Sequence, residues 1–309
     1  MRGQIVKTSV DVAGSGFAVI DRLYERGSKQ QESLGGSCAN VLWSLAMLNR
    51  SVVPILSLGD DATGFEMVHE FESVGADTRY ITRHAGRLSP VLVQFLDATT
   101  GEHHFSFTCP DTSTRFPAYR PIELSELDAA RPIVENCAVF YSDRISPAIV
   151  EAMRATAEAG GIVYFEPSAV SDEALFRQAL RYTSIIKFSE ERLGHVLRPH
   201  LSEMQIFGMV THGERGLEVV HGNYEVSCSA ITAPRVLDTC GSGDMVSVGL
   251  IDRLLGAAAT AATLSLEHVV AGARAGQSLA SANCGFVGAR GLFRELGAAA
   301  ARQALDTRH

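Results

Sequence analysis

The sequence predicts an α/β protein in which helices cover a mostly parallel sheet and a small second sheet projects from it. Short apolar runs alternate with amphipathic stretches over most of the 309 residues, as in chains that alternate strands with helices. Between Gly75 and Asp111 the pattern changes to alternating apolar and polar residues, which indicates antiparallel strands. Two segments, at about residues 22–35 and 87–108, interrupt the rhythm and are expected to form a lid.

The predicted elements follow one another along the chain. Strands are expected at the short apolar runs, which are residues 10–13, 52–58, 138–142, 162–166, 185–187 and 207–211. Helices are expected where apolar residues recur at helical spacing, at residues 39–48, 64–74, 147–159, 172–181, 243–255 and 266–282. Thr100-Gly101 predicts the turn of a hairpin. Because no linker or internal repeat divides the sequence, we expect one domain over residues 1–309.

Composition and charge argue against several functional classes. The 35 acidic residues outnumber the 27 basic ones, and the resulting net charge of −8 disfavours binding to nucleic acid. No apolar run approaches the roughly 20 residues that span a bilayer, and the first residues lack the apolar core of a secretory signal. The six cysteines include no C-x-x-C pair, which disfavours a zinc knuckle or a redox pair. We therefore expect a cytoplasmic protein that binds neither nucleic acid nor membranes.

The strongest local motif is DTCGSGD at residues 238–244, directly before a predicted helix. Small residues at the start of a helix leave backbone N–H groups accessible, and together with the helix dipole these groups form an anion site. Phosphate is the expected ligand of this anion site. At the edge of this site, Asp244 is placed to accept a proton from an attacking hydroxyl. The alternative is a glycine-rich turn in which Asp244 serves only the helix N-terminus.

Two further glycine-rich segments lie near the N-terminus. Gly35 and Gly36 precede Asn40, where paired glycines allow close approach of a ligand and the amide offers a donor and an acceptor to a polyhydroxyl molecule. A turn before a helix explains this segment equally well. Residues 14–21 (GSGFAVID) begin like a dinucleotide-binding loop, but Val19 replaces the third glycine and no helical pattern follows. We expect Asp21 to hold substrate hydroxyls instead.

The order and spacing of these motifs resemble the ribokinase or PfkB family of carbohydrate and nucleoside kinases over nearly the whole chain. The matching segments are residues 16–21, 35–40, 57–64, 211–216 (T-x-G-x-x-G) and 238–244. The resemblance implies a ribokinase-like three-layer α/β sandwich with a small β-sheet lid. It implies that the γ-phosphoryl group of ATP moves to a hydroxyl of a sugar or sugar-like substrate. The alternatives are a nucleoside kinase of the same family, or a sugar- or nucleoside-binding regulatory homologue with weak or no kinase activity.

The resemblance also implies roles for matching residues. Asp244 would be the catalytic base, and the amides of Gly241, Ser242 and Gly243 would form an anion hole. The residues expected to hold substrate hydroxyls are Asp21, Gly36 and Asn40. Those expected to border the nucleotide are Thr211, Gly213, Gly216 and Asn283. Asp238 would bind a monovalent cation such as K⁺, and Mg²⁺ would accompany ATP.

One segment departs from the family pattern. The family's N-x-x-E, which helps to organise Mg²⁺ and the phosphates, should follow the strand predicted at residues 185–187. Ser189 stands at the asparagine position and Arg192 at the glutamate position. Glu190 or Glu191 would then supply the carboxylate for Mg²⁺.

The late part of the chain and the lid leave other questions open. Asn283 is also interpretable as a helix C-cap. Arg290 is expected at the surface, with a contact to phosphate as the alternative, and Trp43 is expected in the core. A sugar acid would need a cationic partner and a nucleoside an aromatic face; the candidates are Arg87, Arg115 and Arg144 for the first, and Phe17, Phe105 and Phe107 for the second. Because an exposed apolar lid face needs covering, we expect a homodimer.

Overall fold

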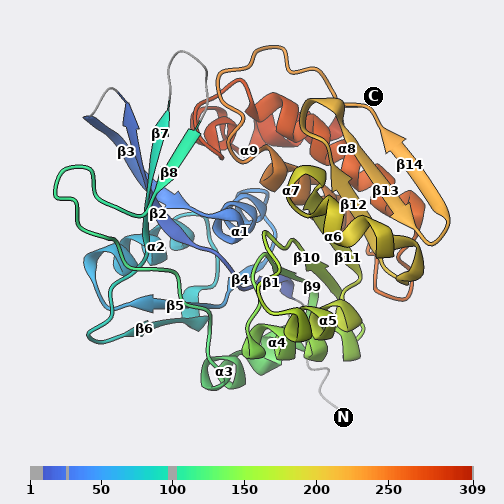
Figure 1. The fold of residues 1–309 in the computed structure, drawn as a ribbon, viewed down its shortest axis with the longest axis horizontal. Coiled ribbons are helices and arrows are strands. Elements are labelled where there is room, and N and C mark those ends of the chain that lie inside the picture. Colours follow the sequence, from blue (N-terminus) through green and yellow to red (C-terminus); the bar gives the residue numbers. More distant parts are fainter. Residues whose placement is uncertain (1–9, 26–27, 97–102, 308–309) are drawn as a thin grey trace, which may run out of the picture.

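The computed structural model describes residues 10–25, 28–96 and 103–307, and within them a large sheet forms the centre of the molecule (Figure 1). Its strand order is β14-β13-β12-β11-β10-β9-β1-β4. The strands are β1 (Val10–Gly14), β4 (Val52–Pro54), β9 (Cys137–Ser142), β10 (Ile162–Phe165), β11 (Ile185–Ser189), β12 (Phe207–Thr211), β13 (Leu217–His221) and β14 (Tyr224–Cys228). All neighbours from β12 to β4 pair in parallel, while β13 and β14 pair antiparallel at one edge.

Helices cover both faces of this sheet. Successive side chains of each buried strand point to opposite faces, so apolar side chains on both faces need covering. One hydrophobic cluster contains Val12 and Tyr141, and the other contains their neighbours Ala13 and Phe140. The helices on the first face are α1 (Ser37–Met47), α7 (Ser242–Gly256), α8 (Leu266–Asn283) and α9 (Gly291–Asp306). Those on the second face are α3 (Leu124–Val134), α4 (Pro147–Glu158), α5 (Glu173–Tyr182) and α6 (His195–Leu197). The expected three-layer sandwich is confirmed.

A separate four-stranded sheet projects from the sandwich, as expected (Figure 1). Its order is β3-β2-β7-β8, from β2 (Val19–Glu25), β3 (Ser28–Gly35), β7 (Val91–Leu96) and β8 (His103–Ser106). We call it the small sheet. It is joined directly to the core, because β2 follows β1 and β3 leads into α1. The predicted turn at Thr100-Gly101 lies outside the described residues.

The predicted strand at residues 52–58 is wrong, because this segment forms two strands in different sheets. β4 ends at Pro54 and pairs with β1, whereas β5 (Leu56–Gly59) pairs with β6 (Ile81–His84). Proline is tolerated there because β4 is the edge strand, and the pairing with β1 ends one residue later, where the Ile55 amide donates to the Gly14 carbonyl at 2.8 Å. β5 leads into α2 (Ala62–Glu72), which contacts β3 of the small sheet.

Other elements were not predicted from the sequence. The helices α3 and α9 are two of them: Pro132 lies inside α3, and Gly297, with φ of 76°, interrupts α9. Proline and glycine normally end a helix.

Among the described residues, no helix combines the length and apolarity needed to cross a membrane.

Helices α7 and α8 approach each other closely through glycines. A Cβ atom at Gly276 would lie 2.3 Å from the Val246 carbonyl oxygen, and one at Gly249 would lie 2.4 Å from the Gly276 Cα. Both obstacles are backbone atoms, which cannot turn away as a side chain does. The position of α7 in the core therefore depends on two residues without side chains.

We expect Gly276→Ala to destabilise the protein by at least about 2 kcal/mol, because the added methyl group forces the two helices apart. Gly256→Ala is the matched control, since the nearest atom to a Cβ at that last residue of α7 is Arg50 Nη2, 3.8 Å away. Thermal and denaturant unfolding of both variants checks this. Equal stability of Gly276→Ala and wild type would show that the helices are packed less closely than described.

Candidate active site

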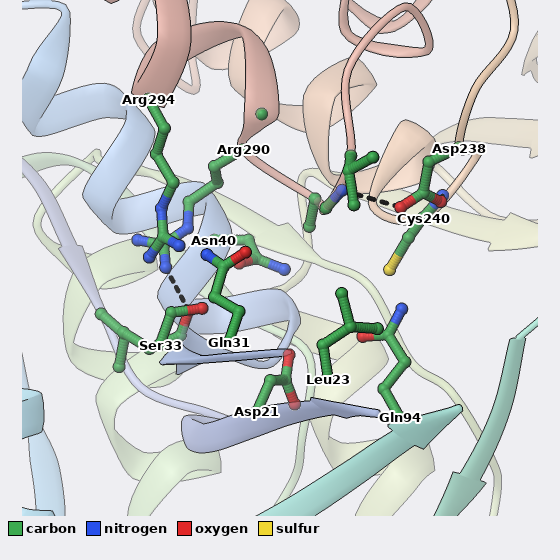
Figure 2. Close-up of a pocket in the computed structure, with 15 residues that line it drawn as sticks. Asp21, Leu23, Gln31, Ser33, Asn40, Gln94, Asp238, Cys240, Arg290 and Arg294 are labelled. Carbon is green, nitrogen blue, oxygen red and sulfur yellow. Dashed lines mark hydrogen bonds between the residues drawn. The ribbon is translucent and has the colours of Figure 1, made fainter. Parts of the chain in front are cut away.

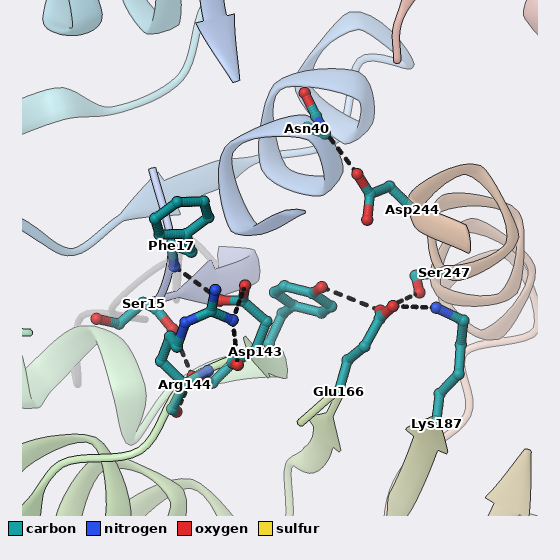
Figure 3. A network of polar contacts seen from close by, with 11 residues as sticks. Ser15, Phe17, Asn40, Asp143, Arg144, Glu166, Lys187, Asp244 and Ser247 are labelled. Carbon is teal, nitrogen blue, oxygen red and sulfur yellow. Dashed lines mark hydrogen bonds and ion pairs between the residues drawn. The ribbon is translucent and has the colours of Figure 1, made fainter. Parts of the chain in front are cut away.

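Polar residues gather where the carboxyl ends of the central strands meet the start of α7 (Figure 3). Asp143 directly follows β9, Glu166 directly follows β10, and Lys187 lies in β11. Asp244 approaches them from the first turn of α7. The carboxyl edge of a parallel sheet is where ligands bind in open α/β proteins.

Asp244 is buried, and the Nδ2 of Asn40 donates a hydrogen bond of 2.8 Å to its Oδ2. Burial, together with the nearby Glu166 charge, raises the pKa of Asp244 to about 6, against the opposing effects of Asn40, Lys187 and Ser37. This carboxylate is therefore mostly ionised at neutral pH, yet its pKa lies close enough to 7 to accept a proton and release it again.

The turn before α7 requires glycine at position 241. Gly241 has φ of 72°, in the left-handed region, and a Cβ atom there would lie 2.4 Å from the Ala289 Cβ. The Ser242 hydroxyl donates to the Thr239 carbonyl at 2.7 Å, and the Ser242 amide donates to the same oxygen at 3.2 Å. That oxygen competes with an anion for the Ser242 amide, so the predicted hole of three amides has one member already engaged.

A buried ion pair, which the sequence analysis missed, lies beside this turn. Lys187 is 3% exposed in its side chain and pairs with Glu166, whose other oxygen accepts hydrogen bonds from Tyr141 and Ser247 (Figure 3). A Cβ atom at Gly243 would lie 3.5 Å from Lys187 Nζ. The Lys187–Glu166 ion pair thus lies next to the helix N-terminus. The available signal was a single lysine inside an otherwise apolar strand.

Asp21, on β2 of the small sheet, faces a cavity between that sheet and α9 (Figure 2). A Cβ atom at Gly35 would lie 1.8 Å from Asp21 Oδ2, so only glycine there leaves room for the carboxylate. Burial raises the pKa of Asp21 to about 7, although Arg290 lowers it. Asp21 Oδ1 and Asn40 Oδ1 are buried without a hydrogen-bond partner among the described residues. Both residues line the cavity, which therefore presents acceptors for hydroxyl donors.

Gly36, the remaining predicted substrate residue, shapes the backbone before α1. It has φ of 88°, and a Cβ atom at this position would lie 2.5 Å from the Phe17 carbonyl oxygen. The glycine therefore lets the end of β3 pass close to the loop after β1. Asn40 and its hydrogen bond to Asp244 depend on this passage, because α1 begins at the next residue.

The expectation that Arg290 lies at the surface is wrong. Its side chain is 2% exposed, and its guanidinium carbon lies 4.4 Å from the centre of the Trp43 ring. Nη2 donates to the Leu34 carbonyl oxygen at the end of β3. Arg290 lines the same cavity as Asp21, together with Arg294 (Figure 2). A flat guanidinium is buried here because an aromatic face and a carbonyl accommodate it.

The expectation that Asn283 contacts a nucleotide is wrong as well. Asn283 is fully buried, and its Nδ2 donates to the carbonyls of Gly288 and Ala289 at 3.4 and 3.2 Å. Its Oδ1 accepts the Leu292 amide at 3.0 Å. The side chain is therefore occupied by backbone groups, and it holds the loop that packs against Gly241. Nor is it the helix C-cap, which is Cys284.

The predicted nucleotide loop follows β12 at one end of the large sheet. Gly213 has φ of 61° and Gly216 has φ of 104°, and a Cβ atom at Gly216 would lie 2.2 Å from the Cys228 carbonyl oxygen. Thr211 donates to the Phe188 carbonyl at 3.4 Å. A cavity next to this loop is lined by residues that include Glu190, Arg198, His212 and Glu218.

The residues predicted to hold metal ions differ in what they offer. Glu190 Oε2 is buried without a hydrogen-bond partner among the described residues and lies 3.6 Å from the guanidinium of Arg198, whereas Glu191 is exposed. The two oxygens of Asp238 accept the Cys240 and Gly288 amides, each at 2.7 Å. Asp238 thus joins two loops, and within the described ranges no cluster of three or more histidine, cysteine or acidic side chains suits a metal.

The suggested partners for a sugar acid or a nucleoside do not line the cavity at Asp21. Arg87 pairs with Glu123 at 3.1 Å, and Arg144 pairs with Asp143 at 2.9 Å. Among the described lining residues none is aromatic, and the candidates absent from that lining are Arg87, Arg115, Arg144, Phe17, Phe105 and Phe107. The cationic residues of the cavity are instead Arg290 and Arg294.

Known proteins share this fold and part of this sequence. A fructokinase from Escherichia coli is 28% identical over 261 residues, covering 77% of this chain and 82% of that protein. The structure of Arabidopsis thaliana ribokinase complexed with ribose and ATP superposes with a TM-score of 0.73 at 17% identity, covering 97% of this chain and 100% of that one. A fructokinase from Xylella fastidiosa with bound ATP also gives 0.73, at 20% identity, covering 90% and 93% of the two chains.

A protein-family pattern also matches most of the chain. The sequence pattern of the pfkB family of carbohydrate kinases matches residues 8–292. These residues include every motif from β1 to the loop before α9. The chain therefore belongs to the PfkB family of carbohydrate kinases.

Proposed function

We propose that this protein transfers the γ-phosphoryl group of ATP to a hydroxyl of a sugar bound between the small sheet and α7. The observation that carries the proposal is the buried Asp244 carboxylate in the first turn of α7, hydrogen-bonded to Asn40 and next to the cavity that Asp21 lines. An E. coli fructokinase is related in sequence, and the ribokinase and fructokinase with similar folds hold ATP. These relatives support both substrates.

Asp244 would act as the base. Its carboxylate takes the proton of the acceptor hydroxyl, the hydroxyl oxygen forms a bond to the γ-phosphorus, and the bond from that phosphorus to the bridging oxygen breaks to release ADP. The amides of Gly241 and Gly243 and the positive end of α7 would stabilise the charge of the transferred group. Lys187, paired with Glu166, would offer further N–H donors next to Gly243.

Asp21, Gly36 and Asn40 would hold the sugar. The unpartnered oxygens of Asp21 and Asn40 suit hydroxyl donors, and a sugar supplies several of these. Gly36 supports them by shaping the backbone. A nucleoside is less well suited, because the described lining of the cavity has no aromatic side chain on which a base could stack.

The nucleotide would extend from the α7 N-terminus towards Thr211, Gly213 and Gly216. Of the two candidate carboxylates, Glu190 fits Mg²⁺ better, because its Oε2 has no hydrogen-bond partner among the described residues and lies in a cavity near this loop. Bound with the phosphates, Mg²⁺ would neutralise charge that builds up during transfer. Asp238 would bind K⁺ only with help from backbone carbonyls, since backbone amides already use its oxygens.

We propose that residues 1–309 act as one kinase domain in which the segments at about 22–35 and 87–108 form the lid. Closure of the small sheet over the sugar would exclude water and so prevent hydrolysis of ATP. Because ATP is supplied inside the cell, the proposal places the enzyme in the cytoplasm.

We expect the purified protein to phosphorylate at least one member of a panel of sugars, sugar acids and sugar phosphates when ATP and Mg²⁺ are present. Mass spectrometry of the products, with nucleosides in the same panel, checks this.

Asp244→Asn should then lower kcat by about three orders of magnitude or more with little change in the sugar Kd, because the substitution keeps the shape of the side chain but removes the base. Asp252→Asn, elsewhere on α7, is the comparison for general damage to the helix. Wild-type kcat in Asp244→Asn would contradict the assigned base.

The raised pKa of Asp21 should make the folded protein less stable at high pH than at low pH. The folded pKa of about 7 exceeds the unfolded value of about 4, so the folded form binds the proton more strongly and stability falls as pH rises between these values. We expect Asp21→Asn to be more stable than wild type on the order of 2 kcal/mol at pH 8, and the difference to shrink towards pH 5. Thermal unfolding at both pH values measures it, with the exposed Asp306→Asn as control. A pH-independent difference would contradict this origin.

We also propose a homodimer that pairs through the small sheet. β8 is an edge strand, and the aromatic side chains Phe105 and Phe107, on it and directly after it, are 57% and 43% exposed. Exposed aromatic residues on a strand edge favour association. Light scattering coupled to size-exclusion chromatography should give twice the mass of 33.1 kDa for wild type and a lower mass for Phe105→Ser. A monomer mass for wild type at micromolar concentration would refute the dimer.

A further inference from the structure

Arg290 has a bonding capacity that the proposed kinase reaction does not use. Its Nη1 is buried and has no hydrogen-bond partner among the described residues, although Nη2 donates to the Leu34 carbonyl. The side chain is 2% exposed, so bulk water does not reach it freely. An unpartnered buried N–H of a charged group is strongly unfavourable. A ligand group that accepts this N–H would remove the cost.

Glu70 pairs with the guanidinium groups at this end of the cavity, while the charges of Asp21 and Asp244 act on Arg290 from farther away. Glu70 is the only carboxylate described within 4.0 Å of Arg290, with its Oε2 3.9 Å from Nη1. Glu70 Oε1 already accepts the Arg294 guanidinium at 3.2 Å and the Leu34 amide at 3.4 Å. No ion pair between Asp21 and either arginine occurs in the described part of the chain. The close ion pairs of the two guanidinium groups are thus with one carboxylate, and Arg290 Nη1 is left without a hydrogen bond among the described residues.

Both arginines point into the cavity from the start of α9 (Figure 2). Their side chains lie next to each other and reach the side of the cavity where Ser33 lies. Asp238 and Cys240 lie on the opposite side. Asn40, which bonds the base Asp244, lies between these two ends. A molecule that offers its hydroxyl to Asp244 would thus direct its far end towards the guanidinium pair.

We propose that Arg290 and Arg294 form a subsite for an anionic group of the acceptor, a carboxylate or a phosphate ester. The preferred substrate is then a sugar acid or a sugar phosphate rather than a neutral sugar. Guanidinium groups bind both anions through pairs of parallel N–H donors. The inference rests on the proposed kinase function, and it refines which acceptor that function uses.

The test compares acceptors that differ in charge, using ATP and Mg²⁺ with fructose, fructose 6-phosphate, fructose 1-phosphate and 2-keto-3-deoxygluconate. We expect kcat/KM of wild type to be at least about 100-fold higher for one of the anionic acceptors than for fructose, as two charge-assisted contacts allow. Preference for a phosphate ester or for the carboxylate identifies which anion the subsite takes.

Arg290→Gln should lower kcat/KM for the preferred anionic acceptor about 100-fold, mainly through KM, while the small rate with fructose changes much less. Arg290→Lys, which keeps the charge but loses the planar fork, should fall between wild type and Arg290→Gln. Arg177→Gln, an exposed arginine paired with Glu173 on α5, is the control and should match wild type.

Arg294→Gln keeps the experiment decisive if Arg290→Gln does not fold, because the Arg294 side chain is 27% exposed. It should lower kcat/KM for the anionic acceptor about tenfold. Calorimetry without ATP gives an independent reading, since the anionic acceptor should bind wild type and lose affinity in both variants. Fructose preferred by wild type, or equal losses for charged and neutral acceptors, would overturn the subsite. Failure of every acceptor to be phosphorylated while the anionic one still binds would instead overturn the kinase function.

Discussion

The site depends on the hydrogen bond between Asn40 and Asp244, which joins residues 204 positions apart in the sequence. Asn40 lies in the first turn of α1, and α1 follows directly from β3 of the small sheet. Asp244 lies in the first turn of α7, whose position is fixed by its glycine contacts with α8. One bond thus links the small sheet, the core helices and the carboxylate that the proposed chemistry needs.

Buried carboxylates surround this bond, and their burial disfavours the ionised form. Burial raises the pKa of Asp21 and of Asp143 to about 7, and that of Asp244 to about 6. Asp143 is held by the Phe17 amide at 2.7 Å and by Arg144, in a position that Gly16 leaves open. Asp21 Oδ1 has no hydrogen-bond partner among the described residues, and the proposed reaction uses both Asp21 and Asp244. Perturbed carboxylates next to a cavity are common at catalytic sites.

The sequence predicts those parts of the site that local geometry decides. Gly36 and Gly241 have positive φ values, and a glycine next to a helix start is a signal that the sequence alone carries. The motif containing Asp244 is recognisable for the same reason. The strands of the large sheet are mostly predictable too, because continuous apolar runs are typical of parallel strands covered on both faces.

The sequence does not predict features that depend on distant partners. Arg290 has the sequence context of a surface loop, and its burial becomes evident only when Trp43, Leu34 and Glu70 are seen around it. Asn283 fails as a nucleotide contact because the loop that folds back over it uses all its polar groups. Such pairings are decided by tertiary packing, which no local pattern records.

The most direct test of this account is a crystal structure of the protein with its acceptor sugar and a non-hydrolysable ATP analogue. The distance to measure is that between the Asp244 carboxylate and the nearest hydroxyl oxygen of the sugar. The account predicts a hydrogen-bond distance of about 2.6–3.2 Å, with the same oxygen in line with the γ-phosphorus. A sugar bound away from Asp21 and Asn40, or a hydroxyl more than about 5 Å from Asp244, would contradict the account, because no direct proton transfer is possible at that separation.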